Sequence, residues 1–402
     1  LEEIKDSDED KIVLEDIKDW DDETIGEILD TDLSSGNSEE TFEEIGSKGS
    51  IINDIQNLLK TKGVIATRKY LTEEVTKWKR AKVKIAVAGQ SAAGKSAFIN
   101  AIRGVVFSDE GYAEEGFGDT TMNIEEYVHP HNKQIIYCDL PGYGTTIITK
   151  YKFLEKVNMS EYDMFIIFFT SVPTTDDKWL VIQLREANIP FCFVRTKLDQ
   201  DIENGKRMGK SKTAVLVDIN NAIARATGAI PVLKDEQIFV ISNHKPYVGD
   251  MSKLVNFMQE RVPKIKCEAI MFSIPAFTED IIESKYQNLL RRMPYTIFLH
   301  ALWAVVVVNP TIIDEIRMYF RVFELDTDYA TYVPGLKHHF DNTYVHKLMD
   351  DLKEKMPSFV VQLTPIYPSI QTYIIYKKYL TNLLDELKID AHKMYKHITT
   401  TV

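Results

Sequence analysis

The stretch Gly89-Gln-Ser-Ala-Ala-Gly-Lys-Ser96 fits the pattern G-x-x-x-x-G-K-S/T and lies between two segments of different character. Val83–Ala88 before it is apolar and β-branched, which predicts a buried strand, and Phe98–Arg103 after it continues as a helix. A glycine-rich turn between a strand and a helix lets backbone N–H groups surround phosphate oxygens at the helix N-terminus. We therefore interpret the stretch as a phosphate loop for a nucleoside triphosphate.

Each part of this loop has an expected role. Lys95 would reach the β- and γ-phosphates and serve catalysis, and Ser96 would bind Mg²⁺. The loop predicts a nucleoside triphosphate and does not identify the base. The residues that we expect to contact the nucleotide here are Gly89, Gln90, Ser91, Ala92, Ala93, Gly94, Lys95, Ser96 and Ala97.

The base is indicated by Thr196-Lys-Leu-Asp199, which follows the apolar run Phe191–Val194. In α/β folds the carboxyl ends of the strands form the ligand-binding edge. A carboxylate accepts the adjacent N1–H and N2–H donors of guanine together, and adenine offers no matching pair. We expect Asp199 to make this contact, Thr196 to line the site and the aliphatic part of Lys197 to cover the ring. The alternative is a loop lysine followed by an aspartate that caps a helix.

A second motif, Asp139-Leu-Pro-Gly142, follows the run Ile135–Cys138. Asp139 would hold Mg²⁺ through a water molecule, and the Gly142 N–H would sense the γ-phosphate and so take part in catalysis. The alternative for this segment is an ordinary β-turn with proline at its second position.

Two weaker signals complete the predicted site. Gly118-Asp-Thr-Thr-Met122 lies between the phosphate loop and the second run, where a first switch loop belongs. Thr121 would complete the Mg²⁺ shell when the γ-phosphate is present, with Thr120 as the alternative. Ser242-Asn243, after the last apolar run, would contact guanine near its O6 atom.

The position after Gly142 favours a particular mode of hydrolysis. Small GTPases commonly carry a water-orienting glutamine just after the D-x-x-G motif. Here Tyr143 occupies that place, followed by Gly144-Thr145-Thr146. Hydrolysis would then depend on a group from elsewhere, such as the first switch loop, the substrate phosphates or a second subunit. We therefore expect a GTPase that is activated by self-association.

Short apolar runs rich in β-branched or aromatic residues predict the strands of the domain that carries these motifs. Continuous apolar strands separated by helices indicate a parallel sheet covered on both faces. From Met251 onward helical periodicity replaces the strand pattern. The expected strands are Val83–Ala88, Ile135–Cys138, Met164–Phe169, Phe191–Val194 and Ile238–Ile241, with helices such as Trp179–Ala187 and Thr213–Ala226 between the later ones.

The predicted fold class is α/β, with four regions along the chain. Residues 1–50 form an acidic leader, either a solvated and partly disordered tail or a short helix that docks on a partner. Residues 51–80 form two helices separated at Gly63. Residues 81–248 form a P-loop GTPase domain, with a mostly parallel sheet and helices on both faces. Residues 249–402 are helical, and together with residues 51–80 they build a second, helical domain.

Composition and charge narrow the class of protein. The chain has 402 residues, of which 44% are hydrophobic and 27% charged, and this excludes wholesale disorder and fibrous chains. Residues 1–50 hold 19 acidic residues and 4 lysines, which gives this segment a charge of −15. The whole chain has a net charge of −12. The remaining 44 basic and 41 acidic residues give +3. A nearly neutral body lacks the basic face that nucleic acid requires, so we expect no nucleic-acid partner.

The longest apolar run, the cysteines and the histidines indicate which membrane insertion, redox compartment and metal binding to expect. The apolar run Tyr295–Val308 is shorter than the ~20 residues that span a bilayer, so it predicts a buried helix. The three cysteines are too far apart for a disulfide framework or a zinc site and fit a reducing compartment; they are Cys138, Cys192 and Cys267. We expect surface or turn positions rather than metal binding for the histidines His129, His131, His338 and His339.

Taken together, these residues resemble the immunity-related (interferon-inducible) GTPases, a dynamin-like family. The resemblance covers the chain from about Ile51 to the C-terminus and leaves residues 1–50 outside it. It rests on Ala88-Gly-Gln-Ser-Ala-Ala-Gly-Lys-Ser-Ala-Phe-Ile-Asn-Ala-Ile-Arg-Gly104, Asp139-Leu-Pro-Gly-Tyr-Gly-Thr145, Glu161-Tyr-Asp-Met-Phe-Ile-Ile167 and Phe193-Val-Arg-Thr-Lys-Leu-Asp199, followed by Gln200-Asp-Ile202.

The resemblance implies properties that composition and spacing do not show. Members bind GTP and GDP, form homo- or hetero-oligomers through their G domains, hydrolyse GTP cooperatively and associate peripherally with intracellular membranes from the cytoplasm. Vertebrate members defend cells against vacuolar pathogens. Lys95 places the chain with the GKS-type members, which resemble effectors. Asp119, a candidate catalytic residue, stands where the typical form has a glutamate, and residues 1–50 differ from the usual short N-terminus.

Two classes of function stay open at this point. One is an active GTPase that assembles on a membrane, and the other is a nucleotide-gated binding module that hydrolyses slowly and recruits partners by its nucleotide state. The C-terminal apolar stretches, including Phe359–Leu363, are interpreted as helical core. Tyr376–Tyr379 and Lys388–Lys396 would form a weakly basic interfacial face.

Overall fold

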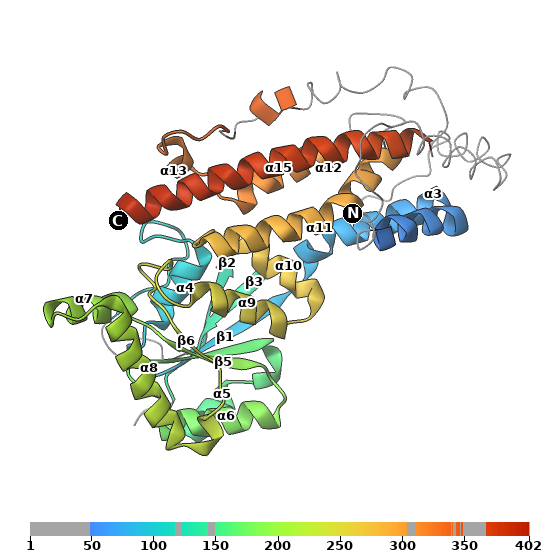
Figure 1. The fold of residues 1–402 in the computed structure, drawn as a ribbon. Helices are drawn as coiled ribbons and strands as arrows, with labels where there is room; N and C mark the ends of the chain where they lie inside the picture. The colour runs from blue at the N-terminus through green and yellow to red at the C-terminus, as the bar shows by residue number, and fades with distance from the viewer. Residues whose placement is uncertain are drawn as a thin grey trace. The chain divides into compact units, whose positions relative to one another are not determined.

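The computed structural model describes residues 49–116, 123–143, 149–303, 310–338, 340, 343–345, 347–348 and 367–401 (Figure 1). The chain divides into two compact units. One comprises the described parts of Leu1–Val75, Leu289–Met318 and Phe340–Asp385, and the other those of Thr76–Asn288, Tyr319–His339 and Glu386–Val402. The domain boundaries predicted from the sequence stay predictions, and the expectations for the acidic leader and for Phe359–Leu363 fall outside the described residues.

The larger unit contains a six-stranded sheet in the order β2-β3-β1-β4-β5-β6. All neighbours in this order pair in parallel except β2, which runs antiparallel to β3 at one edge. The strands are β1 (Val83–Gly89), β2 (Glu125–His129), β3 (Asn132–Asp139), β4 (Met164–Phe169), β5 (Phe191–Arg195) and β6 (Ile238–Val240).

Five of these strands confirm the predicted runs, and β2 was not predicted. Every residue of β4 is buried, which explains its unbroken apolar sequence. β2 begins with Glu125 and Glu126, both exposed, so its sequence has no apolar run to identify it. Within the described part of the chain it pairs on one side only, and a short charged strand is a common way to end a sheet.

Helices cover both faces of the sheet, as the sequence predicts (Figure 1). Phe165, Ile167 and Phe169 of β4 belong to a buried cluster with side chains of α5, α6 and α8. On the opposite face, the ring of Phe168 lies 5.0 Å from that of Phe98 in α4. The helices of this domain are α4 (Lys95–Arg103), α5 (Lys150–Lys156), α6 (Thr175–Glu186), α7 (Leu198–Arg207), α8 (Lys212–Gly228), α9 (Met251–Arg261) and α10 (Lys264–Ser273), with single 3₁₀ turns at Met159–Glu161 and Pro231–Leu233.

The remaining regular elements of the described chain are helices. Gly63 interrupts the first helix with φ 78° and ψ 175°, which confirms the predicted break. Past Asp250 the described residues form no strand, in agreement with the helical periodicity. No described helix combines the length and apolarity needed to cross a membrane. These helices are α3 (Gly49–Arg80), α11 (Glu279–Trp303), α12 (Pro310–Val322), α13 (Asp328–Thr331) and α15 (Tyr367–Thr401).

Two histidine predictions are wrong. His129 at the end of β2 is fully buried, and its Nδ1 accepts a hydrogen bond from the His131 N–H. Burial lowers the pKa of His129 to about 3, so it is neutral at physiological pH. His338 is also buried, with its ring nitrogens 3.0 Å from Glu386 and 3.1 Å from Asp390. His339 lies outside the described residues.

The smaller unit contains a buried ion pair. Arg292 of α11 forms two hydrogen bonds with Glu315 of α12, at 3.1 Å from Nε and 2.9 Å from Nη2, and donates a third from Nη1 to the Val75 carbonyl at 2.6 Å. Both side chains are 3% exposed. A buried pair of this kind is strongly destabilising when one partner is removed, because the other charge stays buried without compensation.

Glu315→Gln should therefore lower the free energy of unfolding by about 3 kcal/mol, because the Arg292 charge loses its partner in a dry environment. The matched control is Asp314→Asn, one residue earlier, whose carboxylate is 62% exposed and pairs with Arg317 at the surface. That change should cost less than about 0.5 kcal/mol. Denaturant unfolding followed by circular dichroism measures both. Equal effects of the two substitutions would contradict the assigned importance of the buried pair.

Candidate nucleotide site

The phosphate loop is shaped by two glycines whose backbone other residues adopt only with strain. Gly89 ends β1 with φ 132°, and a Cβ there would lie 2.1 Å from the Phe168 carbonyl oxygen of β4. Gly94 precedes α4 with φ 82°. Both positions therefore require glycine. Gln90, Ser91, Ala92 and Ala93 form the turn between β1 and α4, and Ala97 lies in the first turn of α4.

The loop places a lysine and a serine at the start of α4. Lys95 is 8% exposed and folds back so that its Nζ donates to the Gln90 carbonyl at 3.2 Å. Its ammonium group thus lies over the turn whose N–H groups would surround phosphate. Ser96 Oγ donates to Asp139 Oδ2 at 2.8 Å, which joins the phosphate loop to the end of β3.

The loops after β5 and β6 are hydrogen-bonded directly to the phosphate loop. Thr196 Oγ1 donates to the Ala93 carbonyl at 2.6 Å, and Asn243 Nδ2 donates to the Gly94 carbonyl at 2.9 Å. Ser242 Oγ donates to Asp199 Oδ1 at 2.7 Å and accepts from the Lys245 N–H at 2.9 Å. The predicted base-binding and phosphate-binding segments therefore converge on one edge of the sheet.

Two features of these loops were not predicted from the sequence. Lys197 adopts φ 64°, a left-handed conformation that turns the chain into α7 and places Asp199 in the first turn of that helix. The Asn243 amide nitrogen donates to the phosphate loop, whereas its Oδ1 is buried and has no hydrogen-bond partner among the described residues. The main role of Asn243 in this structure is to hold the loop after β6 against Gly94.

The metal-binding prediction fits the residue chemistry. Asp139 is 1% exposed, and its carboxylate lies beside the Ser96 hydroxyl. Oxygen donors of this type suit Mg²⁺, which usually keeps several waters and uses substrate phosphates as further ligands. The described residues include no group of three or more histidine, cysteine, aspartate or glutamate side chains able to hold a metal ion.

Tyr143 is directed into the protein core. Its side chain is 6% exposed, and its hydroxyl donates to Oδ1 of the fully buried Asp177 at 2.5 Å. Burial and the adjacent Asp177 raise the pKa of Tyr143 well above its ordinary value, so the hydroxyl keeps its proton. Asp177 was not among the sequence-predicted residues, although Thr174-x-x-Asp177 before an apolar helix is a readable capping pattern.

Several predicted residues lie outside the described part of the chain. These are Asp119, Thr120 and Thr121 of the first switch loop and Gly144-Thr145-Thr146 after Tyr143. Gly142 is described and lies in the irregular segment that follows β3. The catalytic role of Asp119 and the metal-binding role of Thr121 stay predictions.

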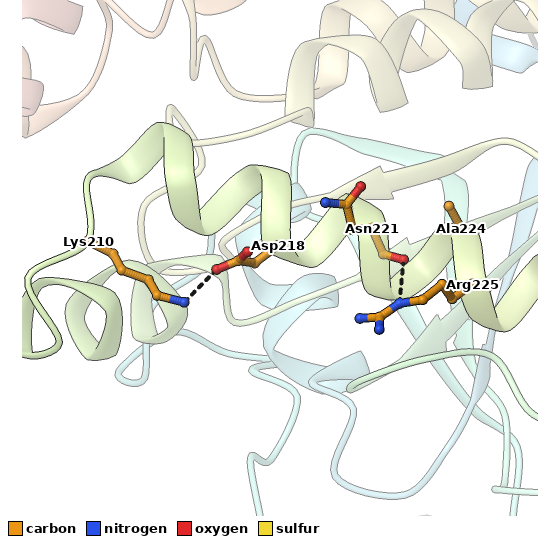
Figure 2. A pocket seen from close by; sticks show the side chains of 5 residues that line it. All are labelled: Lys210, Asp218, Asn221, Ala224 and Arg225. Atoms are coloured by element: carbon orange, nitrogen blue, oxygen red, sulfur yellow. Dashed lines mark hydrogen bonds and ion pairs between the residues drawn. The ribbon is translucent and has the colours of Figure 1, made fainter.

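An open pocket on α8 does not compete with this site. Lys210 Nζ pairs with Asp218 Oδ2 at 2.7 Å, and Arg225 Nε donates to the Asn221 carbonyl at 3.3 Å (Figure 2). None of the predicted nucleotide-binding residues lines it. The lining residues are Lys210, Asp218, Asn221, Ala224 and Arg225.

One family model and several known proteins are similar in sequence to this chain. The family model described as Interferon-inducible GTPase (IIGP) matches residues 48–382. Interferon-inducible GTPase 1 of Mus musculus is 31% identical over 249 residues, which are 60% of this chain and 59% of that protein. T-cell-specific guanine nucleotide triphosphate-binding protein 2 of Mus musculus is 30% identical over 294 residues, which are 70% of this chain and 67% of that protein.

Structural similarity was also found to Aquifex aeolicus Era bound to GDP and aluminium fluoride, with 18% identity and a TM-score of 0.32 over 57% of this chain and 70% of that one. Because this TM-score is low, the fold is assigned from the strand order of the sheet and not from this similarity. The chain spans somewhat more than half the length of the first relatives that it matches. Because the family model matches well over half of the sequence and its motifs meet at one edge of the sheet, the chain belongs to the interferon-inducible GTPase family.

Proposed function

We propose that this protein binds GTP and GDP at the edge of the sheet described above and hydrolyses GTP to GDP. The observation that supports it most strongly is the pair of hydrogen bonds from Thr196 to Ala93 and from Asn243 to Gly94. They hold the guanine-recognition motif and the phosphate loop as one unit. A nucleotide is the kind of ligand that has a base at one end and phosphates at the other.

In this proposal each motif has a distinct task. The Asp199 carboxylate accepts the guanine N1–H and N2–H groups, and its other hydrogen bond from Ser242 fixes its orientation. The phosphate-loop N–H groups and the N-terminus of α4 attract the phosphates, and Lys95 stabilises charge that develops on the γ-phosphate. The Gly142 N–H would detect the γ-phosphate, as proposed from the sequence.

Magnesium would be held by Ser96, by Asp139 through water and by Thr121 of the first switch loop. Bound there, the ion would neutralise charge on the phosphates and orient them for attack by water. The contact between Ser96 and Asp139 holds these two oxygen ligands together before any ion arrives.

The water-orienting group is proposed to come from outside the core of the domain. Tyr143 cannot perform that task in this arrangement, because its side chain is buried and its hydroxyl donates its hydrogen bond to Asp177. We infer that homo- or hetero-oligomers formed through the G domains supply the missing group, in line with the family resemblance. A cytoplasmic role in cell-autonomous immunity follows from the same resemblance.

Peripheral association with intracellular membranes is proposed on the family resemblance alone. Tyr376 Oη lies 2.6 Å from His300 Nε2, and Tyr379 donates to the Leu348 carbonyl, so both tyrosines are used inside the helical unit. Lys388 pairs with Glu283. Co-sedimentation with liposomes in the presence and absence of a GTP analogue tests this part, and absence of pelleting in both states removes it.

Asp199→Asn should weaken GDP binding by about 100-fold, because the charged acceptor for two guanine donors is lost. Xanthosine diphosphate, in which a carbonyl replaces the 2-amino group, should bind this variant better than GDP does, since the asparagine amide can donate to that carbonyl. Isothermal titration measures both affinities. Asp218→Asn on α8 is the control, because Asp218 pairs with Lys210 at the surface. Equal loss for both diphosphates would argue against base recognition by Asp199.

Specific GTPase activity should rise with protein concentration, at least about fivefold across a hundredfold range, because the active species is an assembly. Phosphate release measures it, with Lys95→Ala as the inactive control. Activity that stays flat on dilution contradicts activation by self-association. A Lys95→Ala variant that loses nucleotide and yet retains its partners would instead favour a scaffold.

A further inference from the structure

Asp177 is a buried carboxylate near the nucleotide site that accepts hydrogen bonds from several segments. It lies in the first turn of α6 and is fully buried. It forms no ion pair with the lysines, arginines and histidines that the structure describes. Its charge is offset instead by hydrogen bonds and by the N-terminus of α6, where negative charge is favoured.

The donors to Asp177 come from three different segments. Thr174 donates to Oδ2 from its N–H at 2.6 Å and from its Oγ1 at 2.9 Å, which closes the N-terminus of α6. Tyr143 donates to Oδ1 at 2.5 Å from the segment that follows the D-x-x-G motif. Gln90 Nε2 of the phosphate loop lies 3.4 Å from Oδ2. One carboxylate thus connects α6 with both phosphate-sensing segments.

The two side chains that Asp177 connects, those of Tyr143 and Gln90, each make further contacts. The Tyr143 ring packs edge-on against Phe153 at 5.4 Å and lies 6.2 Å from Trp179. Gln90 accepts from Thr170 Oγ1 at 3.4 Å through its side-chain oxygen, and its backbone carbonyl accepts from Lys95. The path from Tyr143 to the catalytic lysine is therefore continuous: Tyr143, Asp177, Gln90 and Lys95.

We propose that Asp177 is a positioning residue, which fixes the segment after Gly142 against the phosphate loop and so raises the affinity for GTP relative to that for GDP. The proposal rests on the function proposed above and adds a residue to it. The Gly142 N–H is expected to contact only the γ-phosphate. Because Asp177 holds this N–H in position before the nucleotide binds, less conformational entropy is lost when GTP binds, and the affinity for GDP does not change. It also presents that N–H to the charge that develops during phosphate transfer.

The test uses Asp177→Asn and Tyr143→Phe in the full chain, with Asp176→Asn as the matched control. Asp176 is the preceding residue, is partly exposed and pairs with Lys150, so its substitution changes the same charge without touching the connection. Tyr143→Phe removes only the hydroxyl and retains the ring that packs on Phe153. It therefore keeps the test decisive if Asp177→Asn does not fold.

Titration with GDP and with a non-hydrolysable GTP analogue measures the ratio of the two affinities, and this ratio decides the test. Both variants should lower the affinity for the GTP analogue by about five- to tenfold relative to that for GDP and should lower kcat/KM for GTP by at least the same factor, whereas Asp176→Asn should match the wild type. Equal weakening of both nucleotides, or an unchanged ratio, overturns the proposal, because a merely structural role does not distinguish a third phosphate. Failure of the wild type to bind either nucleotide overturns the proposed function, and this proposal with it.

Discussion

The site depends on how closely the phosphate loop approaches its neighbours. Gly89 leaves β1 so near to β4 that the Phe168 carbonyl would collide with any side chain, and Gln90 N–H donates to that same carbonyl at 3.0 Å. This contact fixes where the turn begins. Thr196 and Asn243 then hydrogen-bond to carbonyls later in the turn. Since those two residues come from the loops after β5 and β6, the parallel order of the strands is what delivers them to the same edge.

Much of this arrangement is predictable because its causes are local. A strand followed by G-x-x-x-x-G-K-S specifies a turn that only glycine can adopt at Gly89 and Gly94, and a continuous apolar run such as Met164–Phe169 specifies a strand buried on both faces. The kink at Gly63 follows from the same conformational freedom. These features need no knowledge of distant partners, so sequence reasoning finds them.

What the sequence could not reveal depends on partners that are distant along the chain. β2 is largely exposed and begins with two glutamates, so neither apolar content nor alternation marks it. His129 and His338 look like ordinary surface histidines until the fold buries them. Asp177 was readable as a helix cap, but its contacts with Tyr143 and Gln90 join positions 34 and 87 residues away. No local pattern predicts which buried carboxylate collects such donors.

The placement of Tyr143 links the fold to the chemistry expected of it. A tyrosine that follows the D-x-x-G motif has two possible uses, to face the nucleotide or to brace the segment that carries Gly142. Its burial, its ring contacts with Phe153 and its hydrogen bond to Asp177 correspond to the second use. A proton donated to a buried carboxylate is not available to orient water. Tyr143 therefore stabilises the segment after Gly142, and in the hydrolysis proposed above the water-orienting group would come from another segment or another subunit.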